Sequence, residues 1–428
     1  MFRNFLLKTK LVARSARGLS TTPSLSPETI RIVKSTAPVM AEHGYTITTE
    51  MYRRMLSENS PVKDMFNPTH QVVLPGEVKA RQPYALACSI HAYAANIDNL
   101  GALSEAVERI AQKHVSLHVL PHQYEFVKEN LMWAVVKVLK DAVTPEVAAA
   151  WSEAYDFLAY LLIERERKLR NEKAEAVGGW EGYREFKVDS VTPEGGNIVS
   201  FVMKPADGKP ILDYLPGQYI AIRVPTASGV TVRNYTLSSA PGKDGYRITV
   251  KKAAPLLPDC PPGAVSTHLH TQVKVGDAIQ VGVPCGDYYL KVPDEKPIVL
   301  ISGGVGITPS LCMLEYIMEN TNIKNHVTMI QTWRSPEGEA MHDEIEHLCK
   351  TKQRSNLTIK SLYDDDVTKF PDGNTLMRNI DSLVVDRDSH YYFCGPTEFM
   401  QKIYGGLREW QIPENQINYE FFGPVNNI

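Results

Sequence analysis

A strand, a glycine-rich turn and a helix follow one another without a break in residues 297–318. The strand, 297–302, is continuously apolar, which is typical of a strand buried in a parallel sheet. The turn consists of Gly303, Gly304, Val305, Gly306, Ile307, Thr308 and Pro309. Glycines let a backbone approach a pyrophosphate, and the free amides at the start of the helix expected at 311–318 favour an anion. A glycine turn can equally be structural, but this context predicts a parallel α/β domain that binds a dinucleotide.

The N-terminal third of the chain has a helical pattern, and one of its helices carries a histidine on the apolar face. Five residues recur at the spacing of one helix face: Leu103, Val107, Ile110, Ala111 and His114. A lone histidine on such a face is usually a core residue. Haem iron, however, needs a neutral imidazole whose second ring nitrogen is held by an orienting group. Tyr124, and Glu166 on a helix expected at 151–170, could supply that group.

Length and composition limit the classes of protein. A chain of 428 residues is too long for one hydrophobic core, so two or three domains are expected. The net charge of -3 gives no reason to expect a nucleic acid as a partner, and no apolar run reaches membrane-spanning length. The cysteines form no C-x-x-C pair, which indicates neither a zinc site nor a disulfide framework and fits a reducing compartment. We expect a monomer whose partners are small molecules.

Residues 1–25 differ in composition from the rest of the chain. No acidic residue precedes Glu28, while the segment carries basic residues between apolar ones and serine and threonine at 20–22. The basic residues are Arg3, Lys8, Lys10, Arg14 and Arg17. This composition is typical of a mitochondrial transit peptide, although a basic tail without structure has a similar one. We therefore expect a protein of the mitochondrial matrix, with the cytoplasm as a second location.

The pattern changes after residue 171, the expected end of a helical domain that begins at residue 26. A linker is expected at 172–180, because Val177, Gly178, Gly179 and Trp180 interrupt the helical pattern. From 181 to 292 short β-type runs alternate with turns, at 186–191, 198–203, 219–224, 246–251 and 278–283. This spacing predicts a small antiparallel barrel. The α/β domain is then expected at 293–428.

Within the barrel, residues 233–238 resemble the flavin signature of ferredoxin-reductase-like enzymes. The residues concerned are Arg233, Asn234, Tyr235 and Thr236, and many members have a serine in place of Thr236. An arginine can clamp a pyrophosphate, and a tyrosine two residues later shares its strand face and can lie against the isoalloxazine. Two more segments match the same enzymes: Pro216-Gly217-Gln218-Tyr219 and Gly263-Ala264-Val265-Ser266. The resemblance implies FAD as a cofactor.

Over nearly the whole chain after the first 25 residues, the sequence resembles a flavohaemoglobin. The segments that carry this resemblance are 45–54, 64–67, 106–114 and 419–424. It implies an all-α globin that holds haem b, an antiparallel FAD barrel and a parallel α/β domain for NADH or NADPH. It also implies a nitric oxide dioxygenase, in which hydride passes from NAD(P)H to FAD and electrons pass singly to the haem iron. Dioxygen then reacts with nitric oxide to give nitrate.

The resemblance assigns roles around the haem. His114 is the iron ligand, and Tyr124 and Glu166 complete a hydrogen-bonded triad that increases electron donation, which favours activation of dioxygen over storage. Tyr52 donates a hydrogen bond to bound dioxygen. The other residues placed around the haem by the resemblance are Phe66, Gln82, Leu86 and Lys113. Taken without the family, buried aromatic residues such as Tyr52 and Phe66 are more often ordinary core residues.

Among the roles that the resemblance assigns, that of Gln82 has the least support, because Pro83 follows it. A proline disfavours helical geometry in the residue before it and suits the first position of a helix. We therefore expect a helix that starts at Pro83, with Gln82 at its mouth and not inside the distal pocket. The segment before it, 71–79, also looks longer than is usual in the family.

In the last domain, the resemblance places the nicotinamide at the end of a second strand, within 391–396. Its residues there are Cys394, Gly395 and Pro396. Cys394 is expected to face the nicotinamide, and a buried, inert thiol is the alternative. Near the C-terminus, Phe422 is expected to cover the flavin ring and Glu420 to tune its potential. The other residues of this motif are Phe421, Gly423 and Pro424.

Two questions stay open. The strand expected at 327–333 is followed by Arg334 and Ser335, which could contact the 2′-phosphate of NADPH, whereas Glu337 and Glu339 would oppose it. The same domains could also make a reductase that passes electrons to oxygen, quinones or ferric compounds, or a redox or oxygen sensor. Nitrate formation in the presence of nitric oxide separates these alternatives from a dioxygenase.

Overall fold

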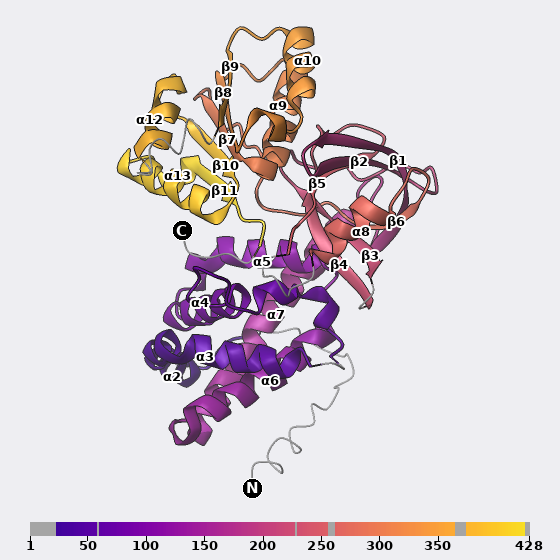
Figure 1. Cartoon of the computed structure of the whole chain (residues 1–428). Coiled ribbons are helices and arrows are strands. Elements are labelled where there is room, and N and C mark those ends of the chain that lie inside the picture. Colours follow the sequence, from indigo (N-terminus) through magenta and orange to yellow (C-terminus); the bar gives the residue numbers. More distant parts are fainter. Residues whose placement is uncertain (1–22, 58–59, 227–228, 256–261, 364–373, 424–428) are drawn as a thin grey trace.

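The computed structural model describes residues 23–57, 60–226, 229–255, 262–363 and 374–423. A bundle of helices, a curled antiparallel sheet and a parallel sheet flanked by helices follow one another along the chain (Figure 1). The expected fold class is therefore confirmed. Most of the transit-like segment and Pro424 lie outside the described residues. Within the described ranges, no helix is both long and apolar enough to cross a membrane.

The helical domain begins as its sequence predicts. Ser26 is the N-cap of the first described helix, and its hydroxyl accepts the backbone N–H of Thr29 at 3.1 Å. The helices are α2 (Pro27–Ser35), α3 (Ala37–Met55), α4 (Arg81–Ala95), α5 (Ser104–Ser116), α6 (Pro121–Leu139) and α7 (Pro145–Glu175). Their apolar faces enclose one core that includes Val33, Ile47, Met51 and Trp151. Short 3-10 turns, among them Lys63–Met65 and Pro68–His70, connect α3 to α4.

Helix α7 is longer than predicted. It runs to Glu175, so residues 172–175, expected in the linker, are helical. Glu172, Lys173, Ala174 and Glu175 are good helix formers, and Glu172 lies 3.8 Å from Lys168 one turn earlier. The chain turns after it at Gly178 and Gly179, where a Cβ on Gly179 would lie 1.8 Å from the carbonyl oxygen of Lys173. Glycine is therefore needed at this turn.

The second domain is a six-stranded antiparallel sheet in the order β4-β3-β6-β1-β2-β5. Its strands are β1 (Tyr183–Gly195), β2 (Ile198–Pro205), β3 (Tyr219–Thr226), β4 (Gly229–Thr236), β5 (Tyr246–Lys251) and β6 (Ala278–Gly282). The edge strands approach each other where Leu237 pairs with Ile248 in an isolated bridge, and the N–H of Ser238 donates to the carbonyl of Arg247 at 2.9 Å. The sheet is thus curled like a barrel without being formally closed. Helix α8 (Ala264–Gln272) lies against β3 and β4.

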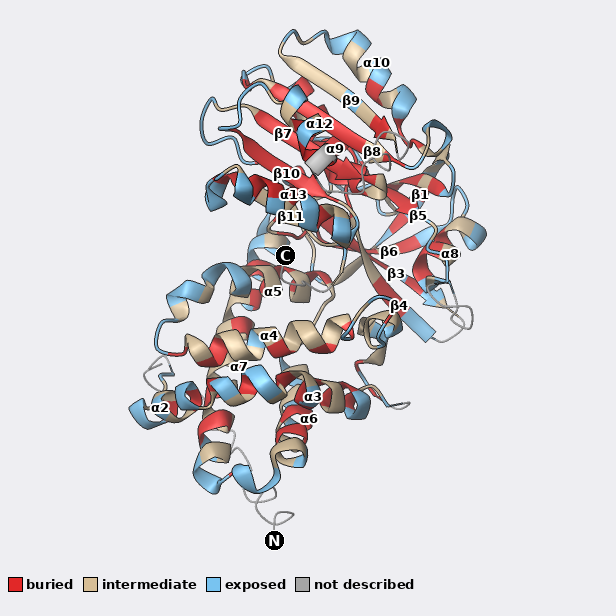
Figure 2. Cartoon of the chain, turned by 60° about the vertical axis from the view of Figure 1, so that its left-hand side comes forward, coloured by how far each residue is buried: buried red, intermediate tan, exposed pale blue. Residues whose placement is uncertain are grey.

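The third domain is a parallel sheet in the order β11-β10-β7-β8-β9. The strands are β7 (Ile298–Gly303), β8 (Val327–Trp333), β9 (Leu357–Tyr363), β10 (His390–Cys394) and β11 (Ile417–Glu420), and the helices are α9 (Ile307–Glu319), α10 (His342–Lys352), α12 (Asn374–Leu383) and α13 (Thr397–Glu409). The central strands are buried on both faces (Figure 2). The strand order reverses between β7 and β10, where open α/β sheets bind ligands.

Helix α5 joins the globin to the barrel. Ala111 and Val115 of α5 pack in one apolar cluster with Tyr219, Val283 and Cys285 of the barrel. Polar contacts surround this cluster: Arg109 with Asp287 at 3.3 Å, Gln112 with the N–H of Gly286 at 3.2 Å, and Ser116 with Asn234 at 2.9 Å. The helix that carries His114 is thereby fixed on the domain that carries the flavin signature.

Candidate functional site

The structure brings His114, Tyr124 and Glu166 together from three different helices. Nδ1 of His114 lies 2.8 Å from Oε1 of Glu166 and 2.9 Å from the hydroxyl oxygen of Tyr124. The Tyr124 hydroxyl donates to the same carboxylate oxygen. Nδ1 is therefore the protonated nitrogen, and Nε2, which has no hydrogen bond in the described part of the chain, keeps its lone pair. This is the arrangement that an iron ligand requires, so these residues fit haem.

Burial makes this triad rigid. Glu166 is fully buried, and its second oxygen is compensated by Arg170, whose Nη2 lies at 3.3 Å. Burial, and next the negative charge of Glu166, raise the pKa of Tyr124 well above its usual value, so its hydroxyl stays protonated as a donor. The sequence analysis missed Arg170. Its position four residues after Glu166 on an expected helix was the available signal.

Tyr52 and Phe66 lie together in the globin core. Tyr52 is 6% exposed, and its ring packs edge-on against that of Phe66 at 5.5 Å between centroids. Burial raises the pKa of Tyr52 to about 12, so the phenol is neutral at physiological pH. Its oxygen accepts a hydrogen bond from Nε2 of Gln82 at 3.1 Å, which leaves its own hydrogen available to another acceptor. Leu86 packs against the same core one turn after Gln82.

The helix start expected at Pro83 was wrong, whereas Gln82 does lie at the mouth of the helix. Helix α4 begins at Arg81, so Gln82 is its second residue and Pro83 its third. Proline is tolerated there because the N–H groups of the first turn have no partner within the helix. The carbonyl of Pro83 accepts from the hydroxyl of Thr48 at 2.7 Å, which ties this first turn to α3. Tertiary packing therefore overrides the local preference of a residue before proline.

Arg233 has the surroundings of an anion clamp. It lies on β4 and donates to the carbonyl of Val232 at 2.6 Å and to the hydroxyl of Thr231 at 3.1 Å. Burial lowers its pKa, and it pairs with no carboxylate within the residues that the structure describes. Arg233 is partly buried, and a partly buried cation without a counter-charge is costly, so Arg233 fits the pyrophosphate of FAD.

The neighbours of Arg233 alternate along β4. Tyr235 shares its strand face, and burial raises the pKa of this tyrosine well above its usual value. Asn234 faces the other side, where its amide donates to Ser116 of α5, so its side chain contacts the globin. Thr236 is buried and pairs with Tyr219, the first residue of β3. The segment predicted at 216–219 thus ends at the start of β3, beside the end of the segment 233–236 on β4.

Val265 and Ser266 lie in the first turn of α8. No side chain of the described residues caps this helix, so its first N–H groups are available to an anion. The side chain of Ser266 is engaged elsewhere, because its hydroxyl accepts the N–H of Ala253 at 3.1 Å and donates to the carbonyl of Gly263 at 3.0 Å. Backbone amides, and not the serine hydroxyl, are the groups that this helix offers to FAD.

The glycine turn lies at the reversal point of the parallel sheet. Gly304 has φ +54°, and nothing lies within 4 Å of the position that its Cβ would take, so the backbone is open to a ligand. Gly306, by contrast, packs under β10, where a Cβ would lie 2.2 Å from the carbonyl oxygen of Cys394. Residues 307–309 begin α9, which has no side-chain cap. The N–H of Ile307 donates to the carbonyl of Gly304, and Pro309 has no N–H, so the open backbone at Gly304 and the amide of Thr308 are the groups that fit the pyrophosphate of NAD(P)H.

Cys394, Gly395 and Pro396 follow β10 on the other side of the same point. A Cβ on Gly395 would lie 3.1 Å from the backbone nitrogen of Gly303, so the two turns touch. Cys394 is fully buried, which raises the pKa of its thiol. Its thiol is therefore a neutral group at physiological pH.

Groups from all three domains surround Glu420 at the end of β11. Burial raises the pKa of Glu420 to about 8; the positive charges of Lys113 and Arg109 oppose the rise, and Asp287 adds to it. Lys113, placed at the haem by the resemblance, donates to the carbonyl of Gly423 at 3.1 Å and so joins α5 to the last domain. Sequence reasoning missed the pair of Arg109 and Asp287, because these residues are 178 positions apart in the chain.

Aromatic residues next to Glu420 differ in burial. Phe421 packs edge-on against Tyr419 at 5.9 Å between centroids. The side chain of Phe422 is 48% exposed.

The two glutamates expected to oppose NADPH differ in burial. Glu337 is exposed. Glu339 is buried and accepts hydrogen bonds from Gln331, Ser361 and Tyr363.

Comparison with known proteins finds three successive family matches along the chain. Residues 49–162 match the model of the Globin family, 185–289 that of the Oxidoreductase FAD-binding domain, and 300–404 that of the Oxidoreductase NAD-binding domain. A flavohemoprotein of Halalkalibacterium halodurans is 42% identical, with 95% of this chain and 99% of that protein covered. Flavohemoprotein A of Dictyostelium discoideum is 39% identical, with 95% and 100% covered.

A solved structure agrees with these relatives. The flavohemoglobin from Malassezia yamatoensis, with bound FAD and heme, superimposes with a TM-score of 0.76 at 29% identity and covers 94% of this chain and 100% of its own. The expected cofactors, haem, FAD and NAD(P)H, are therefore confirmed, as is an NAD(P)H-dependent oxidoreductase. With a globin that fits haem, a barrel that fits FAD and relatives about as long as itself, this chain belongs to the flavohaemoprotein family.

Proposed function

We propose that this chain is a nitric oxide dioxygenase, which converts nitric oxide and dioxygen to nitrate with electrons from NAD(P)H and so removes nitric oxide. When bound, FAD supplies the exchange between hydride and single electrons, and the haem iron supplies the site at which dioxygen and nitric oxide react. Each nitrate requires one electron, so one NAD(P)H serves two turnovers. The residues of the chain bind, orient and shield these groups.

The hydrogen bond from His114 to the buried carboxylate of Glu166 carries this proposal. A carboxylate at 2.8 Å from Nδ1 gives the imidazole more imidazolate character and so makes Nε2 a stronger donor. Strong proximal donation favours activation of dioxygen over reversible storage. Arg170 and Tyr124 keep the carboxylate in place. A sensor without turnover has no need of a ligand held in this way.

Tyr52 supports the proposal from another part of the globin core. Because Gln82 donates to its oxygen, the hydroxyl is oriented with its hydrogen free, and the raised pKa keeps that hydrogen in place. In a buried pocket such a donor stabilises a partly charged ligand. Tyr52 is therefore the residue that would hold dioxygen for reaction with nitric oxide.

Replacing Tyr52 with phenylalanine should speed the release of dioxygen about tenfold or more, since the lost hydrogen bond to a partly charged acceptor is worth roughly 1.5 to 3 kcal/mol. Flash photolysis or stopped-flow mixing of the reduced protein measures this rate. Gln82→Leu should act in the same direction but less strongly. Tyr93→Phe is the matched control, because the buried Tyr93 bonds the carbonyl of Ala154 and not Gln82. An unchanged release rate in Tyr52→Phe would make Tyr52 a packing residue.

The proposal is tested by supplying the purified protein with NAD(P)H, dioxygen and nitric oxide and measuring nitrate and NAD(P)H together. We expect two nitrates for each NAD(P)H consumed. The rate of nitrate formation should decrease strongly in Tyr52→Phe. Consumption of NAD(P)H that does not depend on nitric oxide would instead indicate a reductase or oxidase. Little turnover under any condition would indicate a sensor.

The composition of residues 1–25 supports a further part of the proposal, import into mitochondria. A fluorescent protein fused after residue 25 should enter mitochondria, and the full chain without residues 2–25 should remain in the cytoplasm. Cytoplasmic fluorescence of the fusion would refute import.

A further inference from the structure

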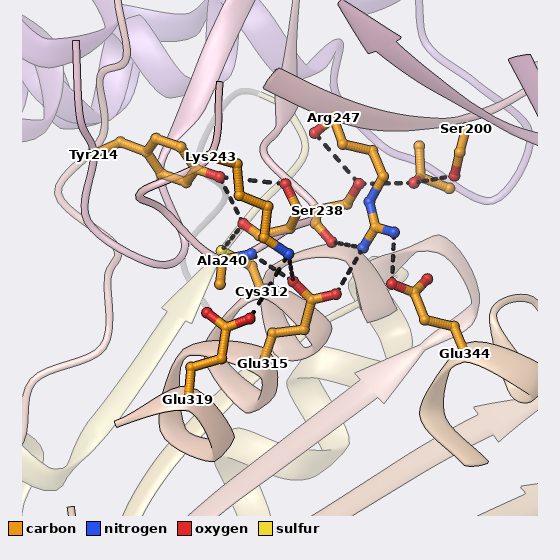
Figure 3. A network of polar contacts seen from close by, with 12 residues as sticks. Ser200, Tyr214, Ser238, Ala240, Lys243, Arg247, Cys312, Glu315, Glu319 and Glu344 are labelled. Carbon is orange, nitrogen blue, oxygen red and sulfur yellow. Dashed lines mark hydrogen bonds and ion pairs between the residues drawn. The ribbon is translucent and has the colours of Figure 1, made fainter. Parts of the chain in front are cut away.

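A cluster of charged side chains joins the barrel to the nicotinamide domain (Figure 3). The barrel contributes Lys243, in the loop before β5, and Arg247, on β5. The nicotinamide domain contributes Glu315 and Glu319 on α9 and Glu344 on α10. None of these residues belongs to the motifs that hold the cofactors, so the cluster needs another explanation.

Arg247 contacts both helices at once. Its Nη1 donates to Glu344 at 2.6 Å, and its Nη2 lies 3.3 Å from Glu315 and also donates to the carbonyl of Ser238. Its side chain is only 15% exposed, so water screens these pairs weakly. Loss of one partner would leave a buried charge uncompensated. The planar fork of arginine spans two carboxylates, which the single ammonium of lysine reproduces poorly.

Glu315 holds the loop that follows β4. Its second oxygen accepts the backbone N–H of Ala240 at 2.6 Å and lies 3.2 Å from Nζ of Lys243. Cys312, almost one turn earlier on α9, has its Sγ 2.9 Å from the carbonyl of Ser239. Helix α9 therefore holds the backbone of residues 239–240 by two side chains on one face.

This loop and this helix continue two cofactor-binding segments. Residues 238–240 follow Thr236, the last residue of the strand that carries Arg233 and Tyr235. Helix α9 starts at Ile307, directly after the glycine turn, and Glu315 lies eight residues, or about 12 Å, along it. A helix of this length moves as a unit. The cluster therefore connects the flavin strand to the nicotinamide turn through two short, stiff segments.

We infer that Arg247 and Glu315 are positioning residues for hydride transfer, which fix the flavin strand β4 and the glycine turn relative to each other. They act through the backbone segments that they hold. Hydride transfer needs its two reacting atoms roughly 3 to 3.5 Å apart, and a displacement of about 1 Å can cost about a hundredfold in rate. The inference concerns the entry of electrons and holds whether or not nitric oxide is the substrate.

Glu344 makes the contact between the barrel and the nicotinamide domain dependent on pH. Burial and the hydrogen bond with Glu315 raise the pKa of Glu344 to about 7, and Arg247 opposes the rise; Lys243 and Glu319 flank Glu315 on the other side. Because this pKa lies above the ordinary value of 4.5, the protonated form favours the folded state. The contribution to stability is complete below about pH 4.5 and is lost as the pH rises through about 7.

The test uses the holoprotein with Arg247→Gln, Arg247→Lys and Glu315→Gln. Stopped-flow mixing with NADH or NADPH, without dioxygen or nitric oxide, gives the limiting rate of flavin reduction and the concentration that half-saturates it. We expect the limiting rate to fall about tenfold to a hundredfold in Arg247→Gln and less in Arg247→Lys, while half-saturation and FAD content stay unchanged. Hydrogen exchange of the protein without nicotinamide should rise in 238–243 and 307–319 and not in the globin.

Two further variants serve as controls. Arg387→Gln breaks an exposed pair with Asp381, at 2.6 and 2.7 Å, inside the nicotinamide domain, and should change neither readout. Glu344→Gln mimics the protonated form, so the loss of stability between about pH 4.5 and pH 7 that Glu344 causes in the parent protein should disappear in it.

Unchanged reduction rates in Arg247→Gln and Glu315→Gln would overturn the inference. It would also be overturned if both variants lost FAD, or exchanged hydrogen faster throughout the nicotinamide domain, because the cluster would then only stabilise the fold. A rise in half-saturation with an unchanged limiting rate would assign the cluster to nicotinamide binding and would equally refute positioning.

Discussion

Replacing His114 with alanine is expected to abolish stable haem binding while leaving FAD bound and reducible by NAD(P)H. His114 offers Nε2 as a ligand because Glu166 and Tyr124 fix its other nitrogen, and no second histidine in the described chain shares those partners. The substitution also removes one of the donors to the buried Glu166, which costs about 1 to 3 kcal/mol in the globin. The haem content per protein and the Soret band measure haem binding. Flavin absorbance measures FAD binding and its reduction by NAD(P)H.

The control for this substitution is His122→Ala, since His122 is exposed at the start of α6. It should keep haem. If His114→Ala lowers the stability of the globin too far for a clear result, added imidazole provides a second measurement, because a free imidazole can take the place of the lost side chain. A normal haem spectrum in His114→Ala without imidazole would show that another residue is the ligand.

Replacing Arg233 with alanine should yield protein that binds haem but is depleted of FAD, so that NAD(P)H no longer reduces the haem. The guanidinium of Arg233 is partly buried without a carboxylate partner in the described chain, and a pyrophosphate would supply that counter-charge. Loss of a charge-assisted contact to each of two phosphates should weaken FAD binding by roughly 3 kcal/mol, or about a hundredfold. Flavin released on denaturation, divided by protein, measures the occupancy.

Arg223→Ala is the matched control, because Arg223 is exposed on the neighbouring strand and pairs with Val232 in the sheet. It should keep its FAD. Arg233→Lys should retain part of the FAD, since lysine keeps the charge but loses the fork. Full FAD occupancy in Arg233→Ala would mean that the uncapped N-terminus of α8 alone binds the pyrophosphate.

The His114→Ala and Arg233→Ala variants should each lose a different cofactor, haem in the first and FAD in the second. Loss of haem in Arg233→Ala, or loss of FAD in His114→Ala, would show that the contacts of α5 with the barrel, such as Ser116 with Asn234, couple the two cofactor sites. If each variant lost only its own cofactor, the interface would only fix the relative position of the two cofactor sites.

Local pattern was sufficient for most of the fold. The apolar run 298–302 is a buried strand of the parallel sheet, and Ser26 caps the first helix as its residue type predicts. The five β-type runs expected in the barrel are all strands. These elements depend on the period of apolar side chains and on chemistry within a few residues, which one sequence contains.

The end of α7 and the start of α4 were placed wrongly from the same kind of information. At Pro83 the helix begins two residues early, because the first turn needs no N–H from proline and packing against α3 favours it. At residues 172–175 the helix continues because its docking on the barrel, with Lys173 donating to the carbonyl of Pro284 at 2.6 Å, favours the helical state. Boundaries are decided by tertiary contacts that the local pattern does not include.

By itself, then, the sequence determined the three domain types, and it indicated His114 with Tyr124 and Glu166, which the structure brings together, because each is carried by residues close in the chain or by a family pattern. The roles predicted for the segments 233–236 and 303–309 stay predictions. The tertiary structure alone decided that Gln82 orients Tyr52, that Asn234 contacts the globin, and that Arg247 joins two helices of the last domain. These contacts pair residues far apart in the sequence. Their energies depend on burial and on distances of a few ångströms, which exist only after the chain has folded.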